Sequence, residues 1–313
     1  MKNKKNIIYA IITVVVFIAL FALVEAGVLS RQYQGLLVPI GVNIMLAVSL
    51  NLIVGFLGEL SLGHAGFMSV GAYAGCLFTV HANLPTMVEL PLALLIGGLV
   101  AAVFGLIIGI PALRLKGDYL AIVTLGFGEI IRSVFNSLDF LGGSGGLKGI
   151  EKSSNYIMAY VLVVITVLVI GNLINSKHGR AIKSIRDNVI AAESVGVNVV
   201  YYKILAFVLS AFFAGVAGVL YGHNLAILKP ATFNFNKSIE ILVMVVLGGM
   251  GNIPGSIIAA IILTILPEVL RFLADYRMLL YAIALIIMML FSSNPTLVAF
   301  RQRLFGKKKK GGK

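Results

Sequence analysis

The chain has 313 residues, of which 59% are hydrophobic and 12% charged, and its mean hydropathy is +1.03. A soluble fold of this length cannot enclose so much apolar surface, so the composition excludes a soluble globular protein and predicts a polytopic membrane protein. The formal net charge of +13 is gathered largely before the first apolar run and after the last one, a placement that argues against nucleic-acid binding.

Apolar runs of about 20 residues, the length of helix that crosses a bilayer core of about 30 Å, recur along the whole chain. Lipid cannot satisfy backbone polar groups, so these runs must be helical, and their Gly/Pro breaks must face protein or water. The predicted fold class is all-α, a polytopic membrane helix bundle with about ten transmembrane or broken membrane helices. In chain order the expected spans are 7–29, 35–57, 61–81, 88–113, 118–136, 156–175, 200–228, a broken pair at 238–250 and 254–272, and 278–293.

The basic residues at the two ends predict the orientation. Three lysines lie within residues 2–5, and Arg301, Arg303 and the run Lys307–Lys310 follow the last span. The positive-inside rule then places both termini in the cytoplasm, which requires an even number of crossings; an alternative to the separate pair is one re-entrant segment elsewhere. We expect residues 1–300 to form a single transmembrane domain and residues 301–313 a basic cytoplasmic tail that binds anionic lipids.

Some functions are not supported by the residue pattern. The run 7–24 follows a basic stretch as a signal peptide would, but it is longer than usual and further spans follow, so we expect an uncleaved first helix. The four histidines lack paired ligand spacing, which predicts no metal site. Cys76 is the single cysteine, and no Ser–His–Asp or Cys–His set stands in a motif context, so we expect no catalytic site.

Two motifs within the apolar runs combine glycine with polar groups. Ser61 precedes His64 at the start of the third span and is expected to cap that helix, so that its positive end points toward a cavity. Gly248 and Gly249 open the break between the paired segments, and broken helices line transport sites. Close helix packing is the structural alternative, both for the start of the third span and for most glycines of the chain, such as Gly71 and Gly75.

Residues 176–199, here called the polar segment, form the longest polar stretch with helical character. Apolar residues recur in it at helical spacing, which predicts one surface helix with one apolar stripe. Gly196 is expected to stop this helix and Asn198 to cap the next one. Two interpretations remain open, a helix that docks a partner and an interfacial helix that lies on the membrane. The stripe comprises Ile182, Ile185, Val189, Ala192 and Val195.

Acidic residues inside apolar spans are the remaining candidates for a substrate path. Glu129, Glu240 and Glu268 would each cost about 2.5–3.5 kcal/mol if left charged and unpaired in the membrane. We expect Glu240 to bind a substrate ammonium and Thr124 to add a hydroxyl to the same path. The alternative is pairing of these carboxylates with nearby Arg or Lys side chains.

The stretch Gly179-Arg-Ala-Ile-Lys-Ser-Ile-Arg-Asp-Asn-Val-Ile-Ala-Ala-Glu-Ser-Val-Gly-Val-Asn198 resembles the cytoplasmic loop of the branched-chain amino acid ABC permeases. Residues 58–73, 117–129 and 238–255 are also similar to this family. The second match and the Gly-Gly-Ser-Gly-Gly loop, residues 142–146, point to its M-type (LivM-like) subunits. The resemblance implies that residues 179–196 couple the chain to an ATPase. The implied coupling residues are Gly179, Arg180, Arg186, Ala191, Ala192, Glu193 and Gly196. The candidate path residues come from the polar groups and the helix break described above and not from the resemblance; they are Ser61, His64, Thr124, Glu129, Glu240, Gly248 and Gly249.

The resemblance also implies the partners of an importer in the bacterial inner membrane. These are a second, H-type permease subunit, two ATP-binding cassette subunits and an extracytoplasmic substrate-binding protein, with a branched-chain or other hydrophobic amino acid as substrate. The sequence has no Gly-x-x-x-x-Gly-Lys-[Ser/Thr] loop, so ATP would be bound by the partners and the chain would need no cofactor of its own. The glycine loop, Gly142, Gly143, Ser144, Gly145 and Gly146, is expected either to approach a carboxylate or a docked binding protein or to be a flexible connector.

Two rival functions remain open at this point. A urea or short-amide importer would use permeases that resemble this chain along the same motifs. A stand-alone secondary transporter would use Glu129 or Glu240 as a proton relay and would need no ATPase.

Overall fold

The computed structural model describes residues 31–270, apart from 83, 113, 114 and 116, together with residues 22, 24, 25, 282, 283 and 286. The described part is helical and contains no β-strand, only an isolated antiparallel bridge between Leu147 and Leu228. The all-α prediction is confirmed. The α-helices are α2 (Arg31–Asn51), α3 (His64–Ala82), α4 (Thr86–Ala112), α5 (Asp118–Ser137), α6 (Tyr156–Asn175), α7 (Lys177–Asp187), α8 (Val189–Ser194), α9 (Val199–Leu225), α10 (Phe235–Gly248) and α11 (Ile253–Val269).

Short helical turns of other types complete the description. A π-helix, η1 (Leu52–Leu57), continues directly from α2 and ends at Gly58, whose φ of 81° lies in the left-handed region. Three 3₁₀ turns lie in the links: η2 (Asp139–Leu141), η3 (Gly143–Gly145) and η4 (Pro230–Phe233).

Six helical stretches among the described residues are long and apolar enough to cross a membrane. They correspond to the predicted spans from 35–57 to 200–228, and their ends differ from the predictions by only a few residues. The predicted pair 238–250 and 254–272 appears as α10 and α11, and the 14 residues of α10 reach only about 21 Å. The predicted spans 7–29 and 278–293 lie almost entirely outside the described residues, so the predicted total of about ten stays a prediction.

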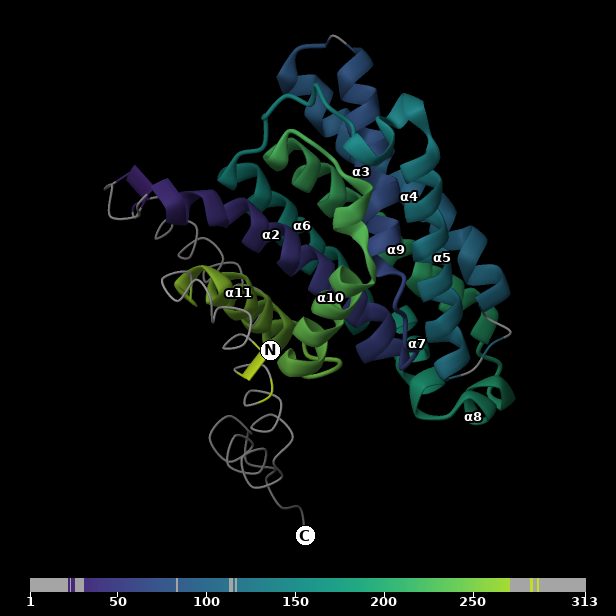
Figure 1. The fold of residues 1–313 in the computed structure, drawn as a ribbon. Coiled ribbons are helices and arrows are strands. Elements are labelled where there is room, and N and C mark those ends of the chain that lie inside the picture. Colours follow the sequence, from purple (N-terminus) through teal and green to yellow (C-terminus); the bar gives the residue numbers. More distant parts are fainter. Residues whose placement is uncertain are drawn as a thin grey trace. The chain divides into compact units, whose positions relative to one another are not determined.

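In the first unit of the chain, residues 1–261, three helices approach one another closely through glycine. A Cβ on Gly71 of α3 would lie 2.2 Å from the Gly215 Cα of α9, and one on Gly97 of α4 would lie 2.6 Å from the Gly71 carbonyl oxygen. These distances leave no room for a side chain, so backbones touch where α3, α4 and α9 lie side by side (Figure 1). The predicted packing role of Gly71 is confirmed.

Helices in this unit differ in how far they are covered. In the most apolar 18-residue window of the span Tyr33–Leu57, 83% of the residues are buried, whereas in α6 only 22% are.

The polar helices α7 and α8 lie at the opposite end of the bundle from the link 138–155, and at the same end as the turn between α10 and α11 (Figure 1). The second unit, residues 262–313, is described only for the end of α11 and three isolated positions.

Candidate functional site

The polar segment forms two helices, and the prediction of one continuous helix is wrong. Ser176 Oγ accepts hydrogen bonds from the backbone N–H groups of His178 and Gly179 and so caps α7. Asn188 has extended backbone angles, φ −162° and ψ 109°, and its side chain accepts from Ala191 N to cap α8. An asparagine side chain that competes for backbone N–H groups favours a cap over a helix interior, which explains the break.

The end of the polar segment follows the sequence prediction. Gly196 has a φ of 84°, a left-handed conformation that glycine adopts without a Cβ clash, and it follows the last turn of α8. Asn198 Oδ1 accepts from Tyr201 N at 3.0 Å and caps α9. Both predicted boundaries are confirmed.

Burial in the polar segment shows which side chains are free to meet a partner. Ile182, Ile185 and Ala192 of the predicted stripe are buried within the bundle. Val195, also in the predicted stripe, is 77% exposed, and Ile190 is 79% exposed. Ile190 lies outside the predicted stripe, and only the break at residue 188 reveals that it is exposed.

The other predicted coupling residues fall into two groups. Arg180, Arg186, Ala191, Glu193 and Gly196 are exposed at the residue level. Gly179 and Ala192 are buried, and a Cβ on Gly179 would lie 2.3 Å from the Ile174 carbonyl oxygen, so Gly179 allows the tight turn from α6 into α7.

Helix α7 packs against the π-helix through its basic side chains. Arg186 Nη1 donates to the Gly55 carbonyl oxygen at 3.1 Å, and its Nη2 lies 3.0 Å from Asp187 Oδ1. Lys183 Nζ lies 5.5 Å from the centre of the Phe56 ring, in cation–π geometry. Arg186 therefore points partly into the bundle, which its place in an exposed polar stretch did not indicate.

The break between α10 and α11 is held by a polar residue that the sequence analysis did not select. Asn51 is fully buried, and its Oδ1 accepts from Gly251 N at 2.8 Å while its Nδ2 donates to Ser256 Oγ at 3.0 Å. The predicted break is present, since Gly249 follows α10 with a φ of 89° and a Cβ on Gly248 would lie 2.4 Å from Ser256 N. An asparagine inside an apolar run was the signal that could have found Asn51.

The start of α3 gathers several predicted path residues, but Ser61 does not cap it. The helix begins at His64, and Ser61 Oγ is buried without a hydrogen-bond partner within the described structure. The backbone N–H groups here are satisfied from other helices: Leu62 N donates to Thr124 Oγ1 at 3.0 Å, and Ala65 N donates to Ser238 Oγ at 3.2 Å. Tertiary contacts have replaced the predicted local cap.

His64 lies at the centre of a buried polar cluster between three helices. Its Nε2 lies 2.8 Å from Ser49 Oγ of α2, and Ser210 Oγ of α9 donates to the Ser49 carbonyl oxygen at 2.6 Å. His64 Nδ1 is buried without a partner in the described part of the chain. Buried polar atoms are normally paired, so unpaired Ser61 Oγ and His64 Nδ1 mark the start of α3 as a place where a polar ligand could be accommodated.

Glu129 and Glu240 are both paired, as the alternative interpretation proposed. Glu129 Oε2 accepts from Arg132 Nε at 2.7 Å, and its Oε1 accepts from Phe235 N, the first residue of α10, at 3.0 Å. Lys237 Nζ lies 3.1 Å from Glu240 Oε2 and 3.2 Å from Asn43 Oδ1. Glu129 thus ties α5 to the start of α10.

A small cavity of about 10 Å³, the scale of a single water molecule, lies between the starts of α3 and α10 and the middle of α5. It is too small for an amino acid in this conformation. Its lining combines predicted path residues with their neighbours: Leu62, Ala65, Gly66, Leu125, Gly128, Glu129, Phe233, Asn234, Phe235 and Ser238.

The glycine loop is built of two tight turns and is anchored at its end. Gly142 and Gly146 have φ values of 85° and 83°, and a Cβ on Gly146 would lie 2.3 Å from the Leu228 carbonyl oxygen. Leu147 and Leu228 exchange two backbone hydrogen bonds, of 2.8 and 3.0 Å. Ser144 and Gly145 are exposed between these anchors, while Gly143 is buried.

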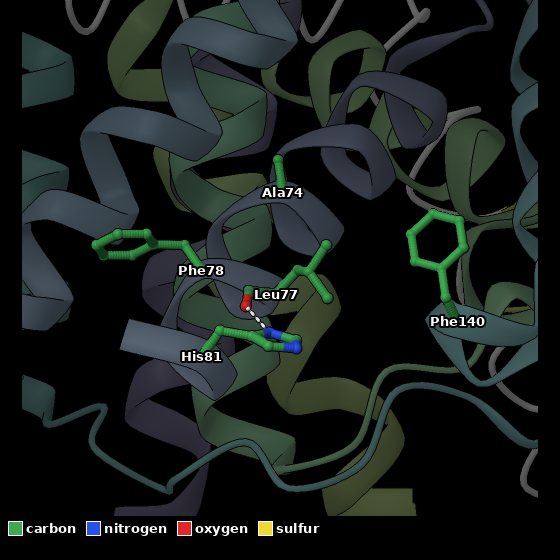
Figure 2. A pocket seen from close by; sticks show the side chains of 5 residues that line it. All are labelled: Ala74, Leu77, Phe78, His81 and Phe140. Carbon is green, nitrogen blue, oxygen red and sulfur yellow. Dashed lines mark hydrogen bonds between the residues drawn. The ribbon is translucent and has the colours of Figure 1, made fainter. Parts of the chain in front are cut away.

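A larger cavity of about 510 Å³ lies between the C-terminal half of α3 and the turn η2. Ala74, Leu77, Phe78 and His81 come from α3, and Phe140 faces them from η2 (Figure 2). His81 Nδ1 is hydrogen bonded to the Leu77 carbonyl oxygen at 2.9 Å, on its own helix. This largely apolar lining offers no carboxylate or ammonium group to a zwitterionic substrate.

Among the described residues, no group of three or more His, Cys, Asp and Glu side chains could hold a metal ion.

Comparison with known proteins gives a consistent picture. The family model for the branched-chain amino acid transport system permease component matches residues 32–291. The chain is 36% identical over 298 residues to the high-affinity branched-chain amino acid transport system permease protein LivM of Salmonella typhimurium, covering 84% of this chain and 69% of the relative. The same values hold for LivM of Escherichia coli K12. The LivH permease protein of E. coli K12 is 36% identical over 90 residues, 29% of each chain. No solved structure matches the chain.

Proposed function

The chain belongs to the family of branched-chain amino acid transport system permease components, and we propose that it is a permease subunit of an ATP-driven importer of branched-chain or other hydrophobic amino acids. Its own contribution is a multi-pass membrane path, and the energy comes from two ATP-binding cassette partners. A second, H-type permease subunit would complete the path, and an extracytoplasmic binding protein would deliver the substrate.

The polar segment carries this proposal. Two short capped helices, α7 and α8, bury Ile182, Ile185 and Ala192 in the bundle, while Ile190 in α8 and Val195 directly after it remain exposed. Singly exposed apolar residues are common on protein surfaces. We infer the docking role from the family, and we take Ile190 and Val195 as the apolar side chains that this segment offers to an ATPase. We place this segment in the cytoplasm with both termini, residues 1–300 forming one permease domain and residues 301–313 a tail on anionic lipids.

We place the substrate path at the start of α3, beside α5 and α10. The unpaired Ser61 Oγ and His64 Nδ1 supply polar atoms there, and Thr124 and Glu129 bind the adjoining backbone. The cavity of about 10 Å³ between these elements is closed to a leucine-sized molecule, so transport requires the elements to separate, as in alternating access. Glu240 and the glycines of the α10–α11 break flank this path.

The test of the function is reconstitution with the partner subunits. The tagged chain is co-expressed with the ATPase and permease subunits encoded beside it, and ATP hydrolysis by the purified complex is measured with binding protein plus leucine or plus urea. Stimulation by leucine-loaded binding protein supports the proposal. Stimulation by urea alone assigns the complex to the short-amide importers, and uptake by this chain alone that a protonophore abolishes and vanadate does not affect would identify a secondary transporter.

A separate test addresses the docking surface. Ile190→Asp should lower both copurification of the ATPase and uptake, because it places a charge at an apolar contact, whereas Ile190→Leu keeps the apolar bulk and should retain both. Glu193→Ala and Gly196→Ala should lower uptake and ATPase stimulation together at an unchanged amount of inserted permease. Normal coupling in Ile190→Asp would remove α8 from the interface.

A further inference from the structure

The side chain of Arg186 and the turn between α10 and α11 meet at one residue, Gly55 of the π-helix. Arg186 Nη1 donates to the Gly55 carbonyl oxygen. On its other side Gly55 lies against the turn, because a Cβ on Gly55 would be 2.2 Å from Gly251 N and 1.8 Å from Asn51 Oδ1. Only a glycine fits between these groups, so a shift of Gly55 must move its neighbours with it.

Asn51 extends this contact across the break. Its amide accepts from Gly251 N, in the turn, and donates to Ser256 Oγ, in the first turns of α11. The Asn51 side chain is fully buried, and a buried polar group that is left without its hydrogen-bond partner costs the free energy of its desolvation. The amide therefore holds the turn and the start of α11 in one position relative to the end of α2.

The π-helix between these contacts is an unusual structure. All six of its residues, Leu52–Leu57, are buried, and it ends at the left-handed Gly58, where a Cβ would lie 2.5 Å from Arg186 Cγ. π-helical turns inside α-helices are rare and occur frequently at functional sites. Here the π-helix lies where α7 contacts the bundle and next to the broken helix pair.

We propose that Arg186, Gly55, Asn51 and Gly251 form a relay that carries movement of α7 to the α10–α11 break, with the π-helix as its hinge. The relay rests on the proposed function, because α7 moves only if an ATPase acts on the polar segment. Arg186 and Asn51 are positioning residues in it: neither needs to touch the substrate or ATP. Movement of the turn would change the position of α10, whose start closes the small cavity beside α3.

The first experiment measures the amount of amino acid taken up per ATP hydrolysed by the complex reconstituted in proteoliposomes. We expect Arg186→Ala and Asn51→Ala each to lower this ratio about tenfold, the scale of one lost charge-assisted or buried hydrogen bond. If both contacts belong to one relay, loss of either already interrupts it. The double variant should therefore have the same uptake-to-ATP ratio as the more severe single variant. Lys152→Ala, which removes an exposed cation from the link 138–155 at the opposite end of the bundle, is the matched control and should retain the wild-type ratio.

The second experiment follows the turn itself. Met250, 62% exposed in the turn, is replaced by cysteine, and its labelling by a maleimide is compared with and without ATP; the native Cys76 is buried. The relay predicts an ATP-dependent change in labelling rate that Arg186→Ala abolishes. If Asn51→Ala does not insert, Ser256→Ala, which removes one hydroxyl from the same clamp, takes its place.

The outcomes separate the two proposals. A wild-type complex that lacks an ATPase contradicts the proposed function and the relay together. If the wild-type complex couples normally, two results would overturn the relay alone. One is that Arg186→Ala and Ser256→Ala both keep the wild-type ratio; the other is that the losses of the single variants multiply in the double variant. A fall in the ratio with non-additive losses and a loss of the ATP-dependent labelling supports it.

Discussion

Replacement of Glu129 by glutamine tests whether this carboxylate holds α5 to α10 or carries a proton. One oxygen of Glu129 accepts from Arg132 and the other from Phe235 N, and the side chain is 35% exposed. Glutamine keeps a carbonyl oxygen that can accept from Phe235 N, but it loses the charge. A proton relay depends on ionisation, which glutamine cannot provide.

The size of the structural effect can be worked from these two contacts. A part-exposed ion pair contributes about 0.2–1 kcal/mol. A carboxylate at the start of a helix contributes a further ~0.3–1 kcal/mol through the helix dipole. The sum is about 0.5–2 kcal/mol. If all of it appears in the transport rate, the rate falls roughly 2- to 30-fold, since every ~1.4 kcal/mol is a factor of ten. We therefore expect Glu129→Gln to transport more slowly but measurably.

The assay is uptake of radiolabelled leucine by cells that express the complete complex, normalised to the amount of inserted permease. Arg132→Gln is the matched control because it breaks the same ion pair and leaves the carboxylate able to ionise. Similar, partial losses in the two variants support the structural role. Complete loss in Glu129→Gln with near-normal uptake in Arg132→Gln would refute this reasoning and favour a proton relay.

Three further changes test the packing, the buried charges and the glycine loop. Gly71→Ala places a Cβ 2.2 Å from the Gly215 Cα, which should cost about 1–3 kcal/mol or more and lower the melting temperature of the detergent-solubilised protein. Gly126→Ala is the control and should leave the melting temperature unchanged, because a Cβ there would have no neighbouring atom within 4 Å. Lys203→Met leaves the carboxylate of its ion-pair partner Glu59, whose side chain is 13% exposed, without its cation, at a cost of up to about 3–5 kcal/mol. The amount of folded protein should therefore fall and recover when Glu59→Leu is added, and no recovery would contradict the ion-pair assignment. Ser144→Asp adds a negative charge to the exposed part of the glycine loop. It should weaken the stimulation of ATP hydrolysis by the binding protein without changing basal hydrolysis. Unaltered stimulation would indicate that the loop is only a connector.

Local chemistry explains which boundaries could be predicted. Gly196 and Asn198 act through their own backbone conformation and a hydrogen bond three residues away, so the surrounding sequence contains the necessary information. Ser61 failed as a predicted cap for the opposite reason. The hydroxyls of Thr124 in α5 and Ser238 in α10 accept hydrogen bonds from backbone groups at the start of α3. Their partners in these bonds are separated by 62 and 173 positions in the sequence, so local spacing could not have identified them.

Apolar run length by itself determined the all-α class and the position of each described span, because lipid leaves the backbone no alternative to helix. Only the tertiary structure decided the direction of Arg186, the role of Asn51 and the exposure of Ile190. These depend on which helices lie next to one another: Asn51 and Gly251 are 200 positions apart, and Arg186 and Gly55 are 131 apart. Helical periodicity places a side chain on a face of its own helix, whereas packing decides what that face meets.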